Sequence, residues 1–207
     1  THPYSSAASD VYKRQVENTL EAFQQSINLG FKYIETDVQA TKDNKLVIFH
    51  DDDLKRMMNV DVDISSINYN ELKNYKINDV YEVPTFLETV SSWPNIRFNI
   101  DPKSDKSAEL LINELKLLYN VDRFCIGSFN SVRLDKIRKA FDFKICTSMG
   151  LNEVVNFYLL RFFGISKVST PCLQLPYYRK GFKVITPNLI RDAHRFNKKV
   201  HAWTIDD

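Results

Sequence analysis

Tyr33-Ile34-Glu35-Thr36-Asp37-Val38 is the stretch of this sequence that points most clearly to a fold and a chemistry. Because successive side chains of a strand point to opposite faces, Glu35 and Asp37 share one face and the residues around them share the other. Two carboxylates inside a protein are costly unless a cation neutralises them, and Mg²⁺ or Ca²⁺ would do so because they bind carboxylate oxygens. An edge strand with a solvated polar face remains open, since Glu-x-Asp is a weak pattern.

Strand-like and helix-like segments alternate around this stretch. The predicted strands are residues 32–38, 46–50, 97–100, 124–128, 144–148, 167–173 and 200–204. The predicted helices are residues 17–29, 69–75, 85–92, 107–119, 131–141, 152–163 and 188–196. The alternation implies βαβ units and a parallel sheet, and the lack of a Gly-rich loop after the first strand argues against a Rossmann or P-loop fold. An eight-stranded barrel usually needs about 250 residues, so these strands predict an incomplete one.

His50 stands at the end of the predicted strand 46–50. Active sites of barrels lie at the carboxyl ends of strands, and histidine titrates near neutrality, so this position suits general acid–base catalysis. A lone histidine is more often a structural hydrogen-bonding residue, but acidic neighbours favour the catalytic interpretation. Asp51, Asp52 and Asp53 are predicted to be solvated or helix-capping carboxylates, not metal ligands.

A third polar cluster, Asn99-Ile100-Asp101-Pro102-Lys103, follows the same alternation. Asp101 would complete a metal site as a third carboxylate, and Lys103 would hold a phosphate oxygen. Pro102 removes one hydrogen-bond donor, which places the group at a strand end. The alternative is a turn that begins at Asp-Pro.

Two further groups could line a pocket at strand ends. Ser128 and Phe129 end one predicted strand, and Trp203 and Thr204 lie in the last. For Phe129, packing in the apolar core is favoured over contact with substrate.

Composition excludes several classes of protein. The chain has 207 residues, 43% hydrophobic and 26% charged, which is ordinary for a globular domain. A net charge of +2 does not favour bulk binding of nucleic acid. No segment reaches the length of a membrane span, and the most apolar run, residues 154–165, is predicted to be a core-packed helix, with a helix lying on a membrane surface as the alternative.

The three cysteines, Cys125, Cys146 and Cys172, show no metal-ligand spacing. Their odd number and wide separation argue against a disulfide framework. They are predicted to be buried thiols in a reducing compartment, which favours a cytoplasmic location.

Taken in order, these segments resemble the glycerophosphodiester phosphodiesterase family. One motif would be weak, but a series in the right order and spacing from residue 17 to the end of the chain is specific. The matching segments are Glu17-Asn18-Thr19-Leu20-Glu21-Ala22-Phe23, Ile34-Glu35-Thr36-Asp37-Val38, Thr41-Lys42-Asp43, His50-Asp51 with Leu54 and Arg56, Pro84-Thr85, Asn99-Ile100-Asp101-Pro102-Lys103, Ser128-Phe129 and Trp203-Thr204.

The resemblance implies a TIM-type (β/α)8 barrel that cleaves small glycerophosphodiesters to glycerol 3-phosphate and an alcohol, in phospholipid breakdown. It implies that Glu35, Asp37 and Asp101 hold a divalent metal ion, Mg²⁺ or Ca²⁺. It also implies that His50 is one of two catalytic histidines and that Lys103 stabilises the phosphate. The supporting or substrate-binding residues would be Glu17, Asn18, Ser128, Phe129 and Trp203.

The sequence departs from the family pattern in three places. The His-Arg-Gly motif of the family's first strand has no match, and Val16 stands where the family usually has proline. Asp101 replaces a glutamate and is shorter by one methylene, which affects ligand reach and metal preference. With His50 as the one matching histidine, the chain is expected to turn over slowly.

Residues 1–15 are expected to be a leader that is foreign to the domain, residues 16–207. Ser5–Gln15 can be encoded by a transposase-type sequencing adapter read in frame, so the first strand of the barrel is expected to be missing. The end of the barrel is expected to be missing as well.

Two alternative functions remain open. One is a lysophospholipase D or phospholipase-type phosphodiesterase on intact lipids, with residues 157–163 as an apolar rim. The other is an inactive barrel that binds phosphodiesters or a partner.

Overall fold

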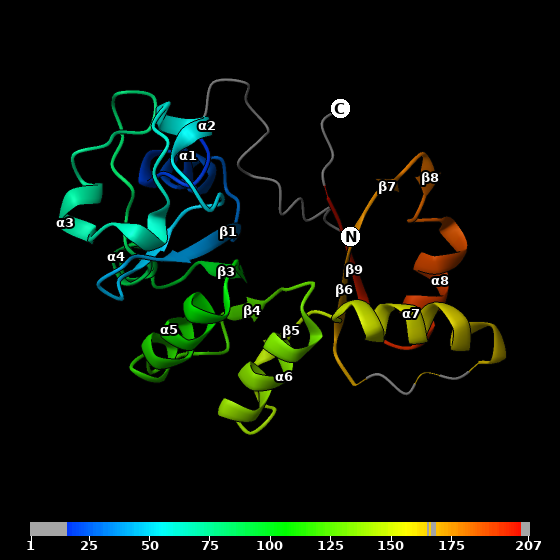
Figure 1. Ribbon diagram of the computed structural model, residues 1–207. Helices are drawn as coiled ribbons and strands as arrows, with labels where there is room; N and C mark the ends of the chain where they lie inside the picture. Colours follow the sequence, from blue (N-terminus) through cyan, green and yellow to red (C-terminus); the bar gives the residue numbers. More distant parts are fainter. Residues whose placement is uncertain (1–15, 165, 167–168, 204–207) are drawn as a thin grey trace. The chain divides into compact units, whose positions relative to one another are not determined.

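The computed structural model describes residues 16–164, 166 and 169–203 (Figure 1). The predicted leader and Thr204 lie outside the described residues. The chain forms two compact units, Thr1–Phe124 and Cys125–Asp207, and their boundary falls inside strand β4 (Phe124–Ile126). The three carboxylates predicted to bind metal therefore all belong to the first unit.

Two parallel strands, β1 (Tyr33–Ala40) and β3 (Arg97–Pro102), form the centre of the first unit. Helix α1 (Leu20–Asn28) precedes β1, and α4 (Phe86–Ser92) precedes β3. Helix α5 (Asp105–Lys116) follows β3 and packs against both strands. Pro102 ends β3, as predicted.

Strand β2 (Leu46–Ile48) corrects the prediction of a parallel sheet throughout. It pairs antiparallel with β1, with Val38 opposite Ile48. Only residues 41–45 connect the two strands, and a parallel crossover needs about a dozen residues, so the chain can only turn back as a hairpin. Asn44 takes the left-handed conformation in this turn, with φ of 62°, which asparagine tolerates well.

Hydroxyl side chains fix where the helices of the first unit begin. The Thr19 hydroxyl accepts a hydrogen bond from the first turn of α1, so this helix begins after it and not at residue 17. Ser104 caps α5 in the same way, slightly before the predicted start at residue 107. Thr85 caps α4, so this helix begins one residue after the predicted start at residue 85.

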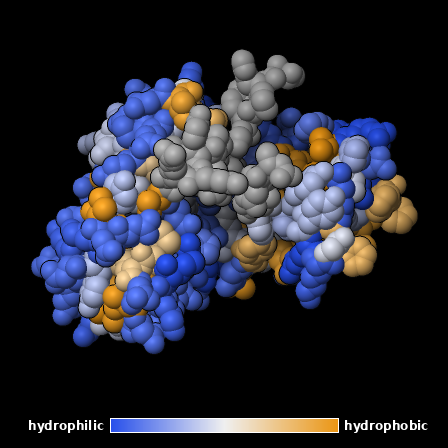
Figure 2. Space-filling view, turned by 90° about the horizontal axis from the view of Figure 1, so that it is seen from above, coloured by the Kyte–Doolittle hydropathy of each residue, from blue (hydrophilic) through white to orange (hydrophobic). Residues whose placement is uncertain are grey.

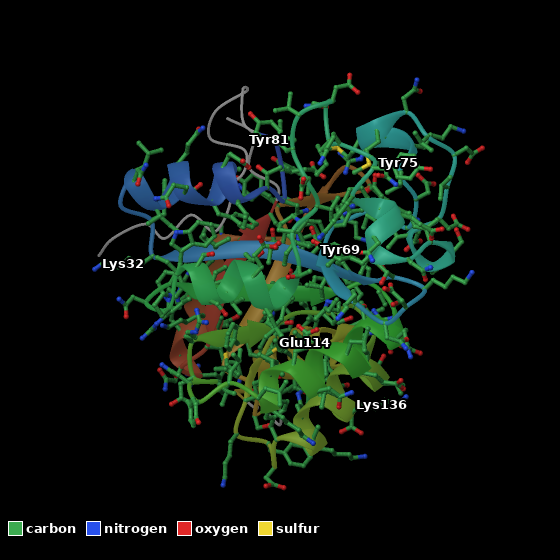
Figure 3. The ribbon with its side chains drawn as sticks, turned by 90° about the vertical axis from the view of Figure 1, so that its left-hand side faces the viewer. Lys32, Tyr69, Tyr75, Tyr81, Glu114 and Lys136 are labelled. Atoms are coloured by element: carbon green, nitrogen blue, oxygen red, sulfur yellow. The ribbon has the colours of Figure 1, made fainter. Side chains whose placement is uncertain are left out.

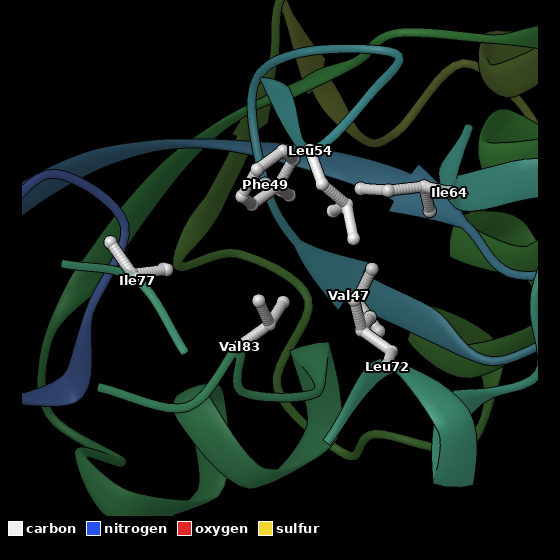
Figure 4. Packing of buried hydrophobic residues seen from close by; sticks show 7 residues of the cluster. All are labelled: Val47, Phe49, Leu54, Ile64, Leu72, Ile77 and Val83. Carbon is white, nitrogen blue, oxygen red and sulfur yellow. The ribbon is translucent and has the colours of Figure 1, made fainter. Parts of the chain in front are cut away.

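The polar stretch after His50 folds over a small apolar cluster (Figure 4). It forms helix α2 (Lys55–Met58), the 3-10 helix η1 (Ile64–Ser66) and helix α3 (Tyr69–Leu72). Their buried side chains meet those of β2 and the following loops in one cluster: Val47, Phe49, Leu54, Ile64, Leu72, Ile77 and Val83. This packing anchors the segment that carries His50.

Glu114 on α5 is a half-buried carboxylate with an unusual protonation state (Figure 3). Burial raises the pKa of Glu114 to about 7, although the positive charge of Lys45 acts to lower it. The Oε2 atom of Glu114 has no hydrogen-bond partner among the described residues. In the unfolded chain the same carboxyl titrates near 4.5. The folded state therefore binds more protons than the unfolded state between these values, so this group lowers the free energy of unfolding as pH rises from about 4.5 to 7.

We expect Glu114→Gln to raise the free energy of unfolding at pH 8 by about 1–2 kcal/mol, after discounting the pKa shift for partial solvent screening. The gain should disappear at pH 4.5, where the wild-type carboxyl is protonated. Urea unfolding at both pH values checks this, with Glu109→Gln, an exposed position on the same helix, as the control. An equal effect of both substitutions at pH 8 would contradict the assignment.

The second unit contains parallel strands joined by helices, as predicted. Strand β4 pairs with β5 (Cys146–Thr147), a bridge between Ser148 and Cys172 continues the sheet, and β6 (Cys172–Pro176) pairs with β9 (Lys199–Trp203). The connecting helices are α6 (Ser131–Ala140), α7 (Leu151–Leu160) with the 3-10 turn η2 (Arg161–Phe163), and α8 (Pro187–Arg195).

The strands of the second unit differ from the prediction in several places. Strand β4 ends at Ile126 and not at residue 128, and β5 covers only Cys146–Thr147 of the predicted 144–148. The strand predicted at 167–173 begins only at Cys172 and runs to Pro176. A small hairpin, β7 (Tyr178–Arg179) and β8 (Phe182–Lys183), follows it and was not predicted. Its turn contains Gly181 with φ of 81°, a conformation that favours glycine, but two-residue strands are too short to leave a pattern in the sequence.

Helix α7 is not the core-packed helix that its composition predicts. Phe157 is fully buried against the cluster around Leu173 and Leu189. The other side of the helix leaves Leu159 exposed, and Phe162 and Phe163 of η2 are more than 70% exposed. Figure 2 shows apolar side chains on the surface of this part of the chain. None of the helices among the described residues is long and apolar enough to cross a membrane.

Candidate active site

The β1–β3 register brings two of the predicted metal ligands together. Asp37 and Asp101 are direct partners in adjacent parallel strands, so their side chains project from the same face. The Lys103 ammonium lies between them, with Nζ 2.7 Å from Asp37 Oδ1 and 3.0 Å from Asp101 Oδ2. Asp37 is buried, with 7% of its surface exposed. Burial by itself would lower the pKa of Lys103. The two carboxylates have the larger combined effect and raise the pKa of this lysine.

Glu35 lies on the same face as Asp37, one step earlier along β1, and is paired with Asn99. It is half-buried, and both residues interact with neighbours. Glu35, Asp37 and Asp101 thus lie on one face of two adjacent parallel strands, and Glu35 and Asp37 share that face as predicted. Their oxygen atoms are a donor set suited to a hard divalent cation, and Asp37 and Asp101 already converge on one cationic group.

The β1–β2 hairpin explains how His50 reaches this surface. Strand β1 continues past Asp37, and β2 returns antiparallel, so the backbone N–H of Phe49 donates to the carbonyl of Asp37 at 3.1 Å. His50 follows directly. The sequence predicts His50 at the carboxyl end of a parallel strand, but the strand before it is antiparallel, so a chain reversal brings His50 to its position.

A series of ion pairs orients His50. Its Nδ1 lies 2.6 Å from Asp51 Oδ1, and Arg56 Nε donates to Asp51 Oδ2 at 2.6 Å. Arg56 also pairs with Glu17. The hydrogen bonds from Arg56, and to a smaller extent the one from His50, lower the pKa of Asp51 against the effect of burial.

This arrangement determines what His50 can do chemically. When the imidazole is neutral and its Nδ1–H donates to the Asp51 carboxylate, the lone pair of Nε2 is available to accept a proton. About half of the His50 side chain is exposed, so a substrate can reach it. Asp51 therefore positions His50 and is not the solvated or capping carboxylate that the sequence predicts. Asp53 does cap α2 locally, accepting from the backbone N–H of Lys55 at 2.9 Å.

Comparison with known proteins establishes the relationship that the motifs suggest. The model of the Glycerophosphoryl diester phosphodiesterase family matches residues 7–207. The chain belongs to this family. Probable glycerophosphodiester phosphodiesterase 2 of Mycobacterium tuberculosis is 30% identical over 92% of this chain and 74% of its own length. A human lysophospholipase D is 31% identical over 92% of this chain and 65% of its own length.

Solved structures show the fold of this glycerophosphodiester phosphodiesterase family member. A phosphodiesterase from Oleispira antarctica, solved in complex with the product sn-glycerol-3-phosphate, superposes with a TM-score of 0.74 at 22% identity. The superposition covers 99% of this chain and 83% of that one. Together with the parallel strands and alternating helices, this likeness confirms the predicted α/β fold of the TIM-barrel type.

Asn18 supports the site of the family member from the loop before α1. Its Nδ2 donates to Asp37 Oδ2 at 3.3 Å, and its Oδ1 accepts from the Thr36 hydroxyl at 2.7 Å. Its backbone is left-handed, with φ of 58°. Asn18 thus contacts a carboxylate directly, whereas the neighbouring Glu17 reaches the site only through Arg56.

The predicted pocket residues Ser128, Phe129 and Trp203 belong to the second unit. The rings of Phe129 and Trp203 meet edge to face, with 5.6 Å between centroids. Phe129 is 57% exposed, so the core role favoured for it is wrong. The Ser128 hydroxyl accepts from the backbone N–H of Asn130, which caps α6, so Ser128 shapes the loop that holds Phe129.

Arg56 is the functional residue that reasoning from single residues missed. It was noted only as part of a family motif, and its role follows from two partners, Asp51 and Glu17, that lie far apart in the sequence. A run of acidic residues followed within one turn by an arginine was the available signal.

Proposed function

We propose that this protein is a metal-dependent phosphodiester hydrolase that converts small glycerophosphodiesters to glycerol 3-phosphate and an alcohol, in phospholipid breakdown. The observation that carries the proposal is the convergence of Asp37, Asp101 and Lys103, together with the backbone bond from Phe49 to Asp37 that fixes the start of the His50–Asp51 segment. A cation, a phosphate-binding ammonium and a proton acceptor are the parts that hydrolysis of a charged phosphodiester requires. The names of the relatives support the same reaction.

Glu35, Asp37 and Asp101 would hold the divalent cation, and their all-oxygen donor set favours Mg²⁺ or Ca²⁺ over a softer metal. Once bound, the metal offsets negative charge on the phosphate oxygens as the reaction proceeds. The aspartate at position 101 reaches less far than a glutamate would, which favours the cation that tolerates the more irregular coordination, Ca²⁺.

Two side chains of this site would act on the substrate itself. Lys103 turns its ammonium from the carboxylates to a non-bridging phosphate oxygen. His50 Nε2 accepts the proton of the attacking hydroxyl, either water or the neighbouring hydroxyl of the glycerol. As the new P–O bond forms, the bond to the alcohol breaks, and the leaving alkoxide takes a proton from water. In the second route, water then opens a cyclic phosphate.

Incubation of glycerophosphocholine with the purified 207-residue protein tests the proposal. The His-Arg-Gly motif that carries the family's second histidine has no match in this sequence, and each acid–base group contributes about 10²–10⁴-fold, so turnover should be slow. Protein in excess over substrate makes slow product formation measurable. We expect glycerol 3-phosphate to form with Mg²⁺ or Ca²⁺ and not with a chelator. Binding of glycerophosphocholine with no product at any metal concentration would instead favour an inactive, phosphodiester-binding barrel.

A lysophospholipase D activity is the second candidate, and one feature of the structure favours it. Phe162 and Phe163 are strongly exposed, and an apolar surface of this kind suits an acyl chain. The 31% identical human relative carries that name. Lysophosphatidylcholine, compared with glycerophosphocholine under identical conditions, separates the two functions. A faster reaction with the lipid, lost in Phe162→Ser with Phe163→Ser, would establish the second function.

A further inference from the structure

Three cysteines that lie far apart in the sequence meet on one face of the second unit's sheet. Cys125 of β4 and Cys146 of β5 are direct partners, and Cys172 at the start of β6 is bridged to Ser148, the residue that follows β5. Because paired residues of parallel strands share a face, and residues 146 and 148 share one too, all three side chains project the same way. Their sulfur atoms lie within 4.8 Å of one another, and Cys125 Sγ is 3.8 Å from Cys172 Sγ.

This spacing fits a metal better than a disulfide. Two thiolates bound to one tetrahedral Zn²⁺ at about 2.3 Å have their sulfurs about 3.8 Å apart, the separation seen for Cys125 and Cys172. The three cysteines are free, whereas a disulfide requires sulfurs about 2.0 Å apart and would leave one thiol over.

A histidine on the next strand supplies a candidate fourth ligand. Strand β9 pairs with β6 so that Gln174 lies opposite His201, and residues 172 and 174 share a face, so His201 projects toward the side of the thiols. His201 Nδ1 is buried and has no hydrogen-bond partner among the described residues. The charge of Cys146 acts on the His201 ring, so the two groups lie near each other.

We propose that Cys125, Cys146 and Cys172 bind one structural Zn²⁺ ion, and that the His201 ring, whose nitrogens lie outside the 4.8 Å spacing of the three sulfur atoms, turns toward them to complete the site. Four protein ligands close the coordination sphere, so the ion would join β4, β5, β6 and β9 and leave no position for substrate. The thiols release their protons on binding, so affinity falls at acid pH. This soft sulfur and nitrogen donor set selects a different metal from the carboxylate set of Glu35, Asp37 and Asp101.

Co²⁺ is the probe that tests the site, because only thiolate ligation gives it a strong near-ultraviolet charge-transfer band. Full chain, reduced and stripped of metal, is titrated with Co²⁺ and then with Zn²⁺. We expect a charge-transfer band and the visible bands of tetrahedral Co²⁺, saturating at one ion per chain and displaced by Zn²⁺. Oxygen ligation at the carboxylates gives no such band, so failure of the hydrolase proposal would leave this result unchanged.

Variants assign the ligands. Each of Cys125→Ser, Cys146→Ser and Cys172→Ser should weaken Zn²⁺ binding at least tenfold, and His201→Ala should weaken it while His194→Ala, an exposed histidine on α8, should not. If a serine variant does not fold, alkylation of the thiols of the wild-type protein is measured instead. Zn²⁺ should block this alkylation, and a chelator should restore it. Thiols that alkylate equally with and without Zn²⁺, or Co²⁺ that binds without a charge-transfer band, would overturn the proposal.

Discussion

Asp37→Asn is expected to lower kcat/KM for glycerophosphocholine by about 10³-fold, because metal-borne charge stabilisation contributes several kcal/mol to such reactions. Asparagine keeps the size of the side chain but removes its negative charge. Asp37 is the most central carboxylate of the site: it is buried, contacts Lys103 at 2.7 Å and accepts from Asn18. The substitution should therefore weaken metal binding as well as turnover. Initial rates and a calorimetric metal titration measure both effects.

Asp61→Asn is the matched control, because it makes the same chemical change at an exposed position. It should leave rate and metal affinity unchanged, and thermal unfolding of both variants checks that the fold is kept. If Asp37→Asn retained metal-dependent turnover within a few-fold of the wild type, the carboxylates on β1 and β3 would not be the metal site.

Asp51→Asn is expected to lower kcat by about 10²–10⁴-fold, the usual contribution of a well-placed acid–base group. The Asp51 carboxylate accepts hydrogen bonds from Nδ1 of His50 and from Arg56. An asparagine amide has one acceptor oxygen and no negative charge, so it cannot replace both bonds. His50 would then lose the orientation that leaves Nε2 facing the substrate. Because Asp51 does not belong to the carboxylate set, metal affinity should stay unchanged, which separates this variant from Asp37→Asn.

Asp53→Asn provides the control two residues away. Its Oδ1 accepts a single backbone hydrogen bond from Lys55, which an asparagine oxygen can also accept. Turnover of this variant should match the wild type. Equal activity of the Asp51 and Asp53 variants would remove Asp51 from the positioning role and leave His50 oriented by other contacts.

Much of the carboxylate site could be predicted from the sequence because it depends on local alternation. Glu35 and Asp37 share a face in any strand, and Pro102 marks a strand end wherever the strand lies. The pairing of Asp37 with Asp101 depends on the register between two strands, which neither segment encodes alone. The resemblance to the family, not the spacing, placed these residues in one site.

Other features depend on contacts between distant segments, and these could not be predicted. Strand β2, which leads back to Asp37 before His50, has the sequence pattern of one more parallel strand. Only the short connection between β1 and β2 indicates that the two strands are antiparallel. Arg56 acquires its role from Glu17 across the fold. The three cysteines are separated by whole βα units, so their spacing resembles no known metal motif, yet adjacent parallel strands bring them together. Phe129 is apolar but exposed beside Trp203, because a loop and not a strand carries it.

Phosphorus NMR of glycerophosphocholine mixed with an excess of metal-free full chain, before and after addition of Mg²⁺ or Ca²⁺, tests the central claim most directly. The account predicts no change until the cation is added, and then conversion of the diester signal to that of glycerol 3-phosphate, with free choline released in equal amount. Formation of phosphocholine and glycerol instead, or the same rate in the presence of a chelator, would contradict it.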